Sequence, residues 1–157
     1  MYKDIRRKDR VLDNAPAYAV LRNSEYGVLS TVNKDNQPYG TPVNYTVIDN
    51  SIFIHSASAT EGHKLENIMS NSKVSFCIVG KTELLPSKFS TKYESVIIFG
   101  AASIVDGENQ KKEALKALLA KYSPDYLDAG EKYINECFNK VTVIKVSIEH
   151  ITGKSRK

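Results

Sequence analysis

The chain has 157 residues, of which 41% are hydrophobic and 25% are charged, and its formal net charge is +4. This length fits one domain with a real core, expected over residues 1–157, and the composition argues against a disordered or fibrous protein. No apolar run approaches the roughly 18 residues that span a bilayer. The charged N-terminus has no apolar segment behind it of the kind found in signal peptides. We therefore expect a cytoplasmic protein that does not bind membranes.

The excess positive charge is concentrated at the two ends of the chain. Its residues are Lys3, Arg6, Arg7, Lys8 and Arg10 near the start and Lys154, Arg156 and Lys157 near the finish. Such clusters can contact nucleic acid. Because they contain little aromatic interleaving and no recognition-helix pattern, we interpret them as solvated tails and expect no nucleic-acid partner.

The first half of the chain predicts one helix followed by a β-meander. Residues 15–22 fit a short helix, with Asp13 or Asn14 as its cap and Pro16 in its first turn. Residues 26–32, 41–48 and 52–56 fit strands, and Asp49-Asn50 fits the turn of a tight hairpin. A helix over residues 62–70 interrupts the meander.

The second half predicts two more strands, two helices and a closing strand. Residues 73–79 and 93–105 fit strands, and the polar stretch 80–92, which contains Pro86, reads as a loop. A helix is expected over 108–121, and Ser123-Pro124 opens another that reaches about Phe138. Residues 142–151 alternate between apolar and polar side chains, which predicts a strand with one buried face.

These elements predict a mainly β protein of the α+β class, with a six-stranded antiparallel split β-barrel and peripheral helices. Closure of the sheet removes exposed strand edges, which favours a barrel. An open α+β sandwich is the structural alternative.

A candidate anion site lies where the apolar run 52–56 leads into the helix that begins at Gly62. A helix N-terminus offers unpaired N–H groups and a partial positive charge, which suits a phosphate. Lys64 adds a full charge in the first turn, and the i, i+3, i+4 spacing of Leu65, Ile68 and Met69 leaves His63 and Lys64 at the edge of the buried side. The alternative is an ordinary surface helix with a solvated lysine.

The sequence contains no familiar catalytic constellation, so the catalytic residues stay unassigned. The three histidines, His55, His63 and His150, have no metal-pair spacing, and Cys77 and Cys137 form no C-x-x-C pair. A nucleophile elbow and a Walker loop are absent. We therefore expect no metal site, and chemistry supplied by a cofactor that carries phosphate.

Several segments occur together in an order that resembles a known family. They are Arg6-Arg7-Lys8-Asp9-Arg10, Tyr26-Gly27-Val28-Leu29-Ser30-Thr31-Val32, Pro38-Tyr39-Gly40-Thr41-Pro42-Val43-Asn44-Tyr45, Ile54-His55-Ser56-Ala57, Gly62-His63-Lys64-Leu65-Glu66-Asn67-Ile68, Lys73-Val74-Ser75-Phe76, Tyr93-Glu94-Ser95-Val96-Ile97-Ile98-Phe99-Gly100 and Ile151-Thr152-Gly153-Lys154. In this order the chain resembles the flavin-binding split-barrel family related to pyridoxamine 5′-phosphate oxidase, in its 5-nitroimidazole resistance (Nim-type) branch.

The resemblance implies a homodimer that binds FMN in two equivalent sites at the subunit interface, and a small-molecule substrate. It places two strands along the flavin ring, the end of a third near the ribityl chain, the helix start at the phosphate, and the partner's strand over the pocket. The residues implied to line the ring are Ser30, Thr31, Pro42, Val43, Asn44 and Tyr45. His55 and Ser56 would lie near the ribityl chain, His63 and Lys64 at the phosphate, and Ser95 and Val96, on the partner's strand, over the pocket.

The sequence departs from the oxidase pattern at two places. His63 stands where the oxidases have an arginine, so the phosphate loses a permanent bidentate donor. The chain also ends without their Arg- and His-bearing substrate segment, which argues against pyridoxamine phosphate oxidation.

Three functions follow from the resemblance. The first is an FMN-dependent oxidoreductase that reduces a small acceptor, such as a nitroimidazole or nitroaromatic compound, with electrons from a reduced nicotinamide. The second is a flavin carrier or sensor without turnover, and the third is a member of the fold that binds haem or F420.

Several site residues could instead have a purely structural role: His55 as a hydrogen-bonded core histidine, Tyr45 as a packing residue and Asn44 as a bridge between backbone groups.

Overall fold

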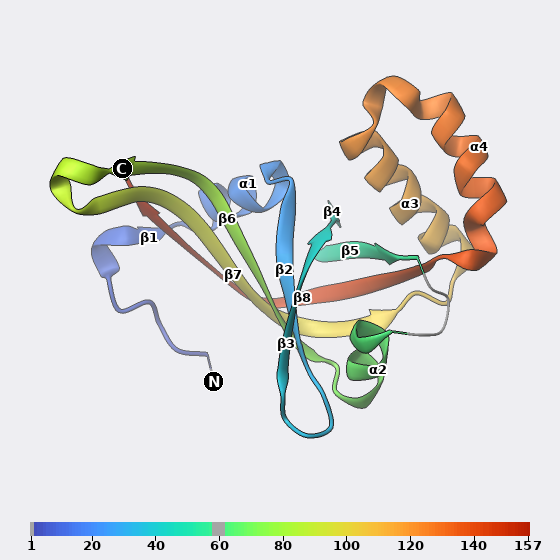
Figure 1. Ribbon diagram of the computed structural model, residues 1–157, viewed down its shortest axis with the longest axis horizontal. Coiled ribbons are helices and arrows are strands. Elements are labelled where there is room, and N and C mark those ends of the chain that lie inside the picture. Colours follow the sequence, from blue (N-terminus) through green and yellow to red (C-terminus); the bar gives the residue numbers. More distant parts are fainter. Residues whose placement is uncertain (1, 58–61) are drawn as a thin grey trace.

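The computed structural model describes residues 2–57 and 62–157 and consists of one curled antiparallel sheet with helices around it (Figure 1). The strand order is β3-β2-β6-β7-β8-β5-β4, and β1 pairs with β8 beside this path. The strands are β1 (Val11–Leu12), β2 (Tyr26–Val32), β3 (Pro38–Asn44), β4 (Thr46–Ile48), β5 (Ser51–Ser56), β6 (Lys73–Leu85), β7 (Ser90–Ile104) and β8 (Thr142–Arg156). The helices are α1 (Asn14–Asn23), α2 (His63–Ser70), α3 (Glu108–Tyr122) and α4 (Leu127–Cys137). The predicted α+β split-barrel class is confirmed.

The predicted number of six strands is wrong, because the sheet formed by the described residues has eight. The short β1 was not expected, and the strand predicted over 41–48 is divided at Tyr45 into β3, which pairs with β2, and β4, which pairs with β5. At the division the Tyr45 hydroxyl donates to the carbonyl of Leu21, and its backbone N–H donates to the Tyr122 hydroxyl at 2.9 Å. Contacts with α1 and α3 therefore replace strand pairing at this residue.

The loop predicted over residues 80–92 is also wrong, because this stretch is a long β-hairpin. β6 continues to Leu85 and β7 begins at Ser90, with a register shift between Val79 and Thr82. Pro86 opens the short turn between them, and Phe89 closes it with a positive φ of 48°. β8 likewise runs past its predicted end, because β7 and β1 pair with its last residues.

The inner face of the sheet forms the main core. Leu29, Phe76 and Ile98 lie opposite one another on three neighbouring strands, and each is fully buried. The ring of Phe76 packs edge-on against Tyr45 with 5.0 Å between centroids. Gly27 allows this ring its place, since a Cβ at residue 27 would lie 2.4 Å from the ring. A second cluster joins Phe53 and Val143 to the apolar face of α3.

The outer face of the same sheet carries two cross-strand rows of side chains. Val28, Cys77, Ile97 and Thr152 form one row, and Ser30, Ser75, Phe99 and His150 form the other. We call these eight residues the outer rows. Tyr2 stacks on His150 with 4.7 Å between ring centroids, and its hydroxyl donates to Glu149 at 2.6 Å. The N-terminal arm therefore lies across one end of this face.

Helices α3 and α4 project from the end of the sheet (Figure 1). Ser123-Pro124 opens a 3₁₀ turn (Pro124–Tyr126) before α4 begins at Leu127. The last turn of α3 is fastened to the barrel, because Lys121 donates to the Ser24 carbonyl at 2.8 Å and its ammonium lies 3.9 Å from the centroid of the Tyr45 ring. By contrast, α4 has no buried residue. In the part of the chain that the structure describes, no helix is long and apolar enough to cross a membrane.

Candidate functional site

The barrel is split between two strand edges. β3 is the terminal strand of the sheet and pairs with β2 alone among the described strands. β4 pairs with β5 only as far as Phe53, so the last residues of β5 pair with β8 on one side only. β3 and β5 lie next to each other here without forming a described ladder. Their unpaired backbone N–H and C=O groups are therefore available to a ligand.

Helix α2 begins on the same side of the molecule. Gly62 precedes it with a φ of +129°, which a residue with a side chain rarely adopts. The Gly62 carbonyl accepts from the N–H groups of Leu65 and Glu66 at 2.9 and 3.1 Å. The first N–H groups of the helix have no partner inside it and carry the positive end of its dipole.

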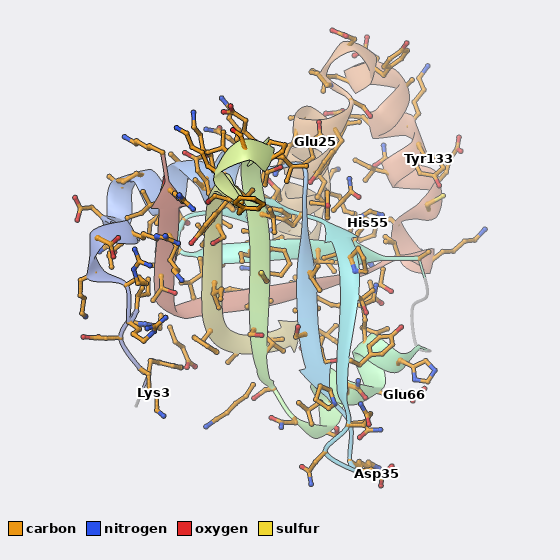
Figure 2. The ribbon with its side chains drawn as sticks, turned by 60° about the vertical axis from the view of Figure 1, so that its left-hand side comes forward. Lys3, Glu25, Asp35, His55, Glu66 and Tyr133 are labelled. Atoms are coloured by element: carbon orange, nitrogen blue, oxygen red, sulfur yellow. The ribbon has the colours of Figure 1, made fainter. Side chains whose placement is uncertain are left out.

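Titratable and aromatic side chains gather at this helix start. The ring of Tyr39, on β3, lies 5.5 Å from the ring of His63. His55 is exposed, but partial desolvation lowers its pKa, and the positive charge of Lys64 lowers the pKa further, so these two side chains are electrostatic neighbours. The His55 imidazole is therefore mainly neutral at pH 7 and can either donate or accept a hydrogen bond. Figure 2 shows His55 and, further along the same side of the molecule, Glu66 of α2.

The alternation of β2 and β3 divides the predicted ring-lining residues between the two faces. Ser30 belongs to the outer rows, while Thr31 is 1% exposed and accepts from the Asn67 amide at 2.9 Å. Pro42 and Asn44 are exposed, whereas Val43 and Tyr45 are buried in the core. Thr31 therefore anchors α2 to β2, and only the outward-facing members of the set present side chains to solvent.

The remaining predicted residues fall into three places. His55, His63 and Lys64 lie together at the start of α2, and Ser56 is buried at the end of β5. Ser95 is half-buried on β7, while Val96 is fully buried in the core. Since β2 and β6 separate β3 from β7, one chain does not bring Ser95 and Val96 to the split.

Two residues near the split were missing from the predicted set. Tyr39 contacts His63, and the hydroxyl of Thr41 is buried without a hydrogen-bond partner in the described part of the chain. An unpaired buried hydroxyl is costly unless a water or ligand satisfies it. Both residues belong to the same Pro38–Asn44 strand as Pro42 and Asn44, and strand alternation could have pointed to them.

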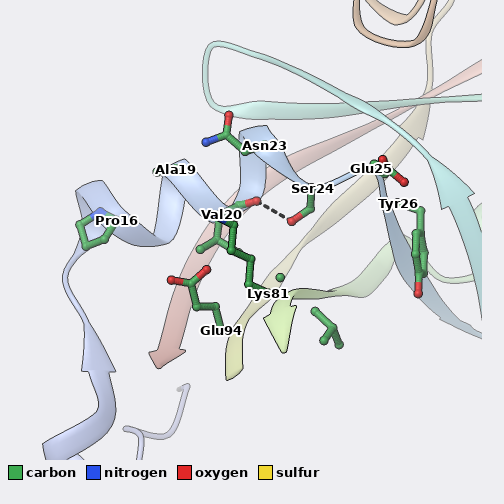
Figure 3. Close-up of a pocket in the computed structure, with 11 residues that line it drawn as sticks. Pro16, Ala19, Val20, Asn23, Ser24, Glu25, Tyr26, Lys81 and Glu94 are labelled. Atoms are coloured by element: carbon green, nitrogen blue, oxygen red, sulfur yellow. Dashed lines mark hydrogen bonds between the residues drawn. The ribbon is translucent and has the colours of Figure 1, made fainter. Parts of the chain in front are cut away.

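A large cavity of the described residues lies away from the split. It has a volume of about 560 Å³ and is bounded by α1, the start of β2 and the β6–β7 hairpin (Figure 3). Val20, Tyr26, Lys81 and Glu94 line it, and none of the predicted site residues does. At its wall the Ser24 hydroxyl donates to the Val20 carbonyl at 2.8 Å and closes the end of α1. The described residues also contain no group of three His, Cys, Asp or Glu side chains arranged to hold a metal ion.

Solved structures share this fold at low sequence identity. A protein of Bacteroides thetaiotaomicron, provisionally named a 5-nitroimidazole antibiotic resistance protein, matches with a TM-score of 0.73 and 22% identity over 92% of this chain and 85% of its own. A conserved hypothetical protein of Mycobacterium tuberculosis gives 0.82 and 22% over 97% and 90%. The flavocytochrome Anf3 of Azotobacter vinelandii gives 0.76 and 18% over 98% and 72%.

No curated protein matches the sequence significantly. The family model described as pyridoxamine 5′-phosphate oxidase matches residues 13–155, which include every strand from β2 to β7 and most of β8. The expected resemblance is thus confirmed, with a Nim-type protein among the structural relatives. This chain belongs to the pyridoxamine 5′-phosphate oxidase family.

Proposed function

We propose that this protein is an FMN-dependent oxidoreductase that passes electrons from a reduced nicotinamide to a small acceptor, such as a nitroimidazole or nitroaromatic compound. The observation that carries the proposal is the position of Lys64 and His63 at the start of α2, beside the two unpaired strand edges of the split barrel. The flavin would supply the redox chemistry, and the chain would supply binding, orientation and electrostatics.

The groups at the split fit a flavin phosphate. A dianionic phosphate is stabilised by a helix N-terminus and by a nearby cation, here Lys64. In this proposal His55 and the backbone of Ser56 face the ribityl chain, and the free edge of β3 at Val43 and Asn44 hydrogen-bonds the polar edge of the ring. The buried hydroxyl of Thr41, which lacks a described partner, is a further candidate donor.

The active form in this proposal is a homodimer. The outer rows and their flanks leave large apolar side chains in water: Ile97 is 40% exposed, Phe99 37%, Val79 58% and Tyr26 57%. Such a face is characteristic of a protein–protein interface. In this proposal a two-fold partner covers it and brings the partner's Ser95 to the split of this subunit, because a pocket lined by the strands of one small barrel would be shallow.

Two considerations favour a small acceptor taken up beside the flavin. The 5-nitroimidazole resistance relative shares the fold over most of its length. The chain also offers no dinucleotide-binding fingerprint, so a nicotinamide would have to bind transiently over the ring. In this proposal the donor and the acceptor therefore use the same face of the flavin in turn.

The first experiment is an absorption spectrum of the purified protein, followed by titration with FMN and with riboflavin, which lacks the phosphate. Replacing Lys64 by Ala should weaken FMN binding by about 10- to 100-fold, because a charge-assisted contact contributes roughly 1.5–3 kcal/mol. The same change should leave riboflavin binding unaltered. Lys112→Ala, on the exposed side of α3, is the matched control.

Three outcomes would contradict the proposal. They are the absence of flavin binding by the wild type, equal weakening of both ligands by Lys64→Ala, and a spectrum dominated by a Soret band, which would assign a haem instead. Turnover is tested separately, as nicotinamide oxidation and nitro reduction above the background of free FMN. A loaded protein without turnover would be a flavin carrier or sensor.

A further inference from the structure

Positive charge gathers at the end of the molecule that carries the β6–β7 hairpin. Three segments meet there: the part of the arm that leads into α1 (residues 7–13), the hairpin (residues 81–94) and the end of β8 (residues 153–157). They contain nine of the 22 Lys and Arg residues but four of the 18 Asp and Glu residues, a net side-chain charge of +5. The rest of the chain carries −1, so this end accounts for the whole excess.

Strand pairing holds the three segments together. Val11 of β1 lies opposite Lys154 of β8, and Arg156 of β8 lies opposite Tyr93 of β7. A guanidinium nitrogen of Arg10 donates to the Tyr93 hydroxyl at 3.4 Å, which ties the arm to the hairpin. The two basic ends of the sequence therefore form one surface, although each read alone predicts a solvated tail.

An open cleft of about 440 Å³ lies on this surface. We call it the basic cleft; its charged side chains are Lys81, Lys92, Arg156 and Lys157, with Glu83 and Glu94. The Lys92 ammonium lies 3.1 Å from the Glu83 carboxylate and is neutralised. The other three cations form no ion pair with any carboxylate of the described chain. The cleft thus holds more unpaired positive than negative charge.

Tyr93 reports the electrostatic potential at this place. The hydrogen bond from Arg10 lowers the pKa of its phenol, and the charges of Lys154, Arg10 and Arg7 lower it further. An ionised oxygen is therefore stabilised at the wall of the cleft, as the oxygens of a bound phosphate would be.

We infer that the basic cleft binds a compact anion with two or more adjacent phosphates, such as a nucleoside diphosphate. Its volume lies within the range of small-molecule sites. Glu83 and Glu94 interrupt the cationic surface, which disfavours a long polyanion but leaves Lys81, Arg156 and Lys157 free to surround a short one. The β6–β7 hairpin and the C-terminus, which line the cleft, lie at the end of the sheet away from α2 of the same subunit (Figure 1), so within one chain the cleft is separate from the proposed flavin site.

The test is the fluorescence anisotropy of N-methylanthraniloyl-ADP on the full-length protein at low salt, with competition by unlabelled ADP, pyrophosphate and AMP. We expect saturable binding, with ADP and pyrophosphate competing better than AMP. The double variant Lys81→Glu with Lys157→Glu should weaken binding at least tenfold. Both side chains are exposed, so the fold should persist, as circular dichroism would show.

The matched control is Lys132→Glu with Lys140→Glu, which changes the net charge equally at exposed sites in and just after α4. It should alter the affinity less than twofold, and Lys64→Ala should not alter it. The inference is overturned if both double variants behave alike, if the wild type does not bind, or if FMN displaces the probe. Tighter binding of a single-stranded oligonucleotide of about 20 nucleotides than of ADP would overturn it in favour of a nucleic-acid surface.

Discussion

The two faces of the same four central strands meet different surroundings, although their residues alternate along one backbone. Leu29, Phe76 and Ile98 on the inner face are fully buried, while their direct sequence neighbours Val28, Cys77 and Ile97 on the outer face are partly exposed. Both faces are apolar at these positions. The apolar side chains of the inner face are removed from water by folding alone. Those of the outer face would be removed from water only if another surface covered them, which is why we propose a partner subunit there.

The largest effect should come from the inner face. Phe76→Ala removes a fully buried ring between Gly27 and Tyr45, so we expect a loss of about 3–5 kcal/mol of unfolding free energy. Ile97→Ala, on the outer face of the next strand, should cost under about 1 kcal/mol in dilute monomer. Urea denaturation measures both, and equal losses would mean that the two faces are not distinct.

The outer face should instead control association. Ile97→Asp places a charge in the centre of the outer rows, so we expect the fold to persist and the dimer dissociation constant to rise about 100-fold, or about 2.8 kcal/mol. Leu127→Asp, which makes the same kind of change on exposed α4, is the control. Sedimentation equilibrium of the two variants provides the measurement. A wild-type protein that stays monomeric while it binds FMN tightly would contradict the proposal that the outer face is a dimer interface.

Alkaline pH should separate a buried tyrosine from an exposed one. Burial raises the pKa of Tyr45, so the unfolded chain releases this proton from about pH 10 while the folded chain retains it. Stability should then fall by about 1.4 kcal/mol per pH unit above pH 10, and the contribution is fully present below that pH. Tyr45→Phe should remove the contribution of Tyr45 and leave that of Tyr122, whose pKa burial also raises, and Tyr26→Phe should retain both. Parallel thermal melts from pH 9 to about pH 11 would show either result.

The smallest expected effect contrasts two adjacent residues of β2. Thr31→Val leaves the buried Asn67 amide without its acceptor, and we expect a cost of about 1–2 kcal/mol. Ser30→Val, one residue earlier and on the outer face, should change the stability by under about 0.5 kcal/mol. If the Ser30 variant proves the more destabilised of the two, the assignment of faces is wrong.

Local patterns predicted the elements whose stability is local. The alternation of residues 26–32 gave β2 its observed limits. The spacing of Leu65, Ile68 and Met69 was right for Leu65 and Ile68, which lie in the core, and wrong for Met69, which is 64% exposed. The apolar pattern continues through Tyr45, so the break there could not be read locally; it depends on Leu21 and Tyr122, 24 residues before it and 77 after it. Pro86 suggested a long loop because proline and polar residues are typical both of long loops and of the tight turns that join two strands.

The same holds for the candidate site: its local features could be predicted from the sequence, and its long-range features could not. The position of Lys64 at a helix start follows from the sequence, and so does the inward or outward direction of neighbouring residues on a strand. The burial of Val96 and the distance of Ser95 from the split depend on strand order, which one sequence does not reveal. The cleft between the two basic ends depends on the pairing of β1 with β8, which brings residues 11 and 154 together.

Helices α3 and α4 are attached to the barrel to different degrees, so we expect α4 to unfold locally before the end of α3 does. Lys121 and Tyr122 hold the end of α3 to Ser24, Glu25 and Tyr45, whereas α4 contributes no buried side chain. Amides of α4 should therefore exchange with solvent deuterium through small fluctuations, and those at the end of α3 only when the barrel itself opens. The helical pair would then behave as two cooperative units, with the boundary at Ser123-Pro124.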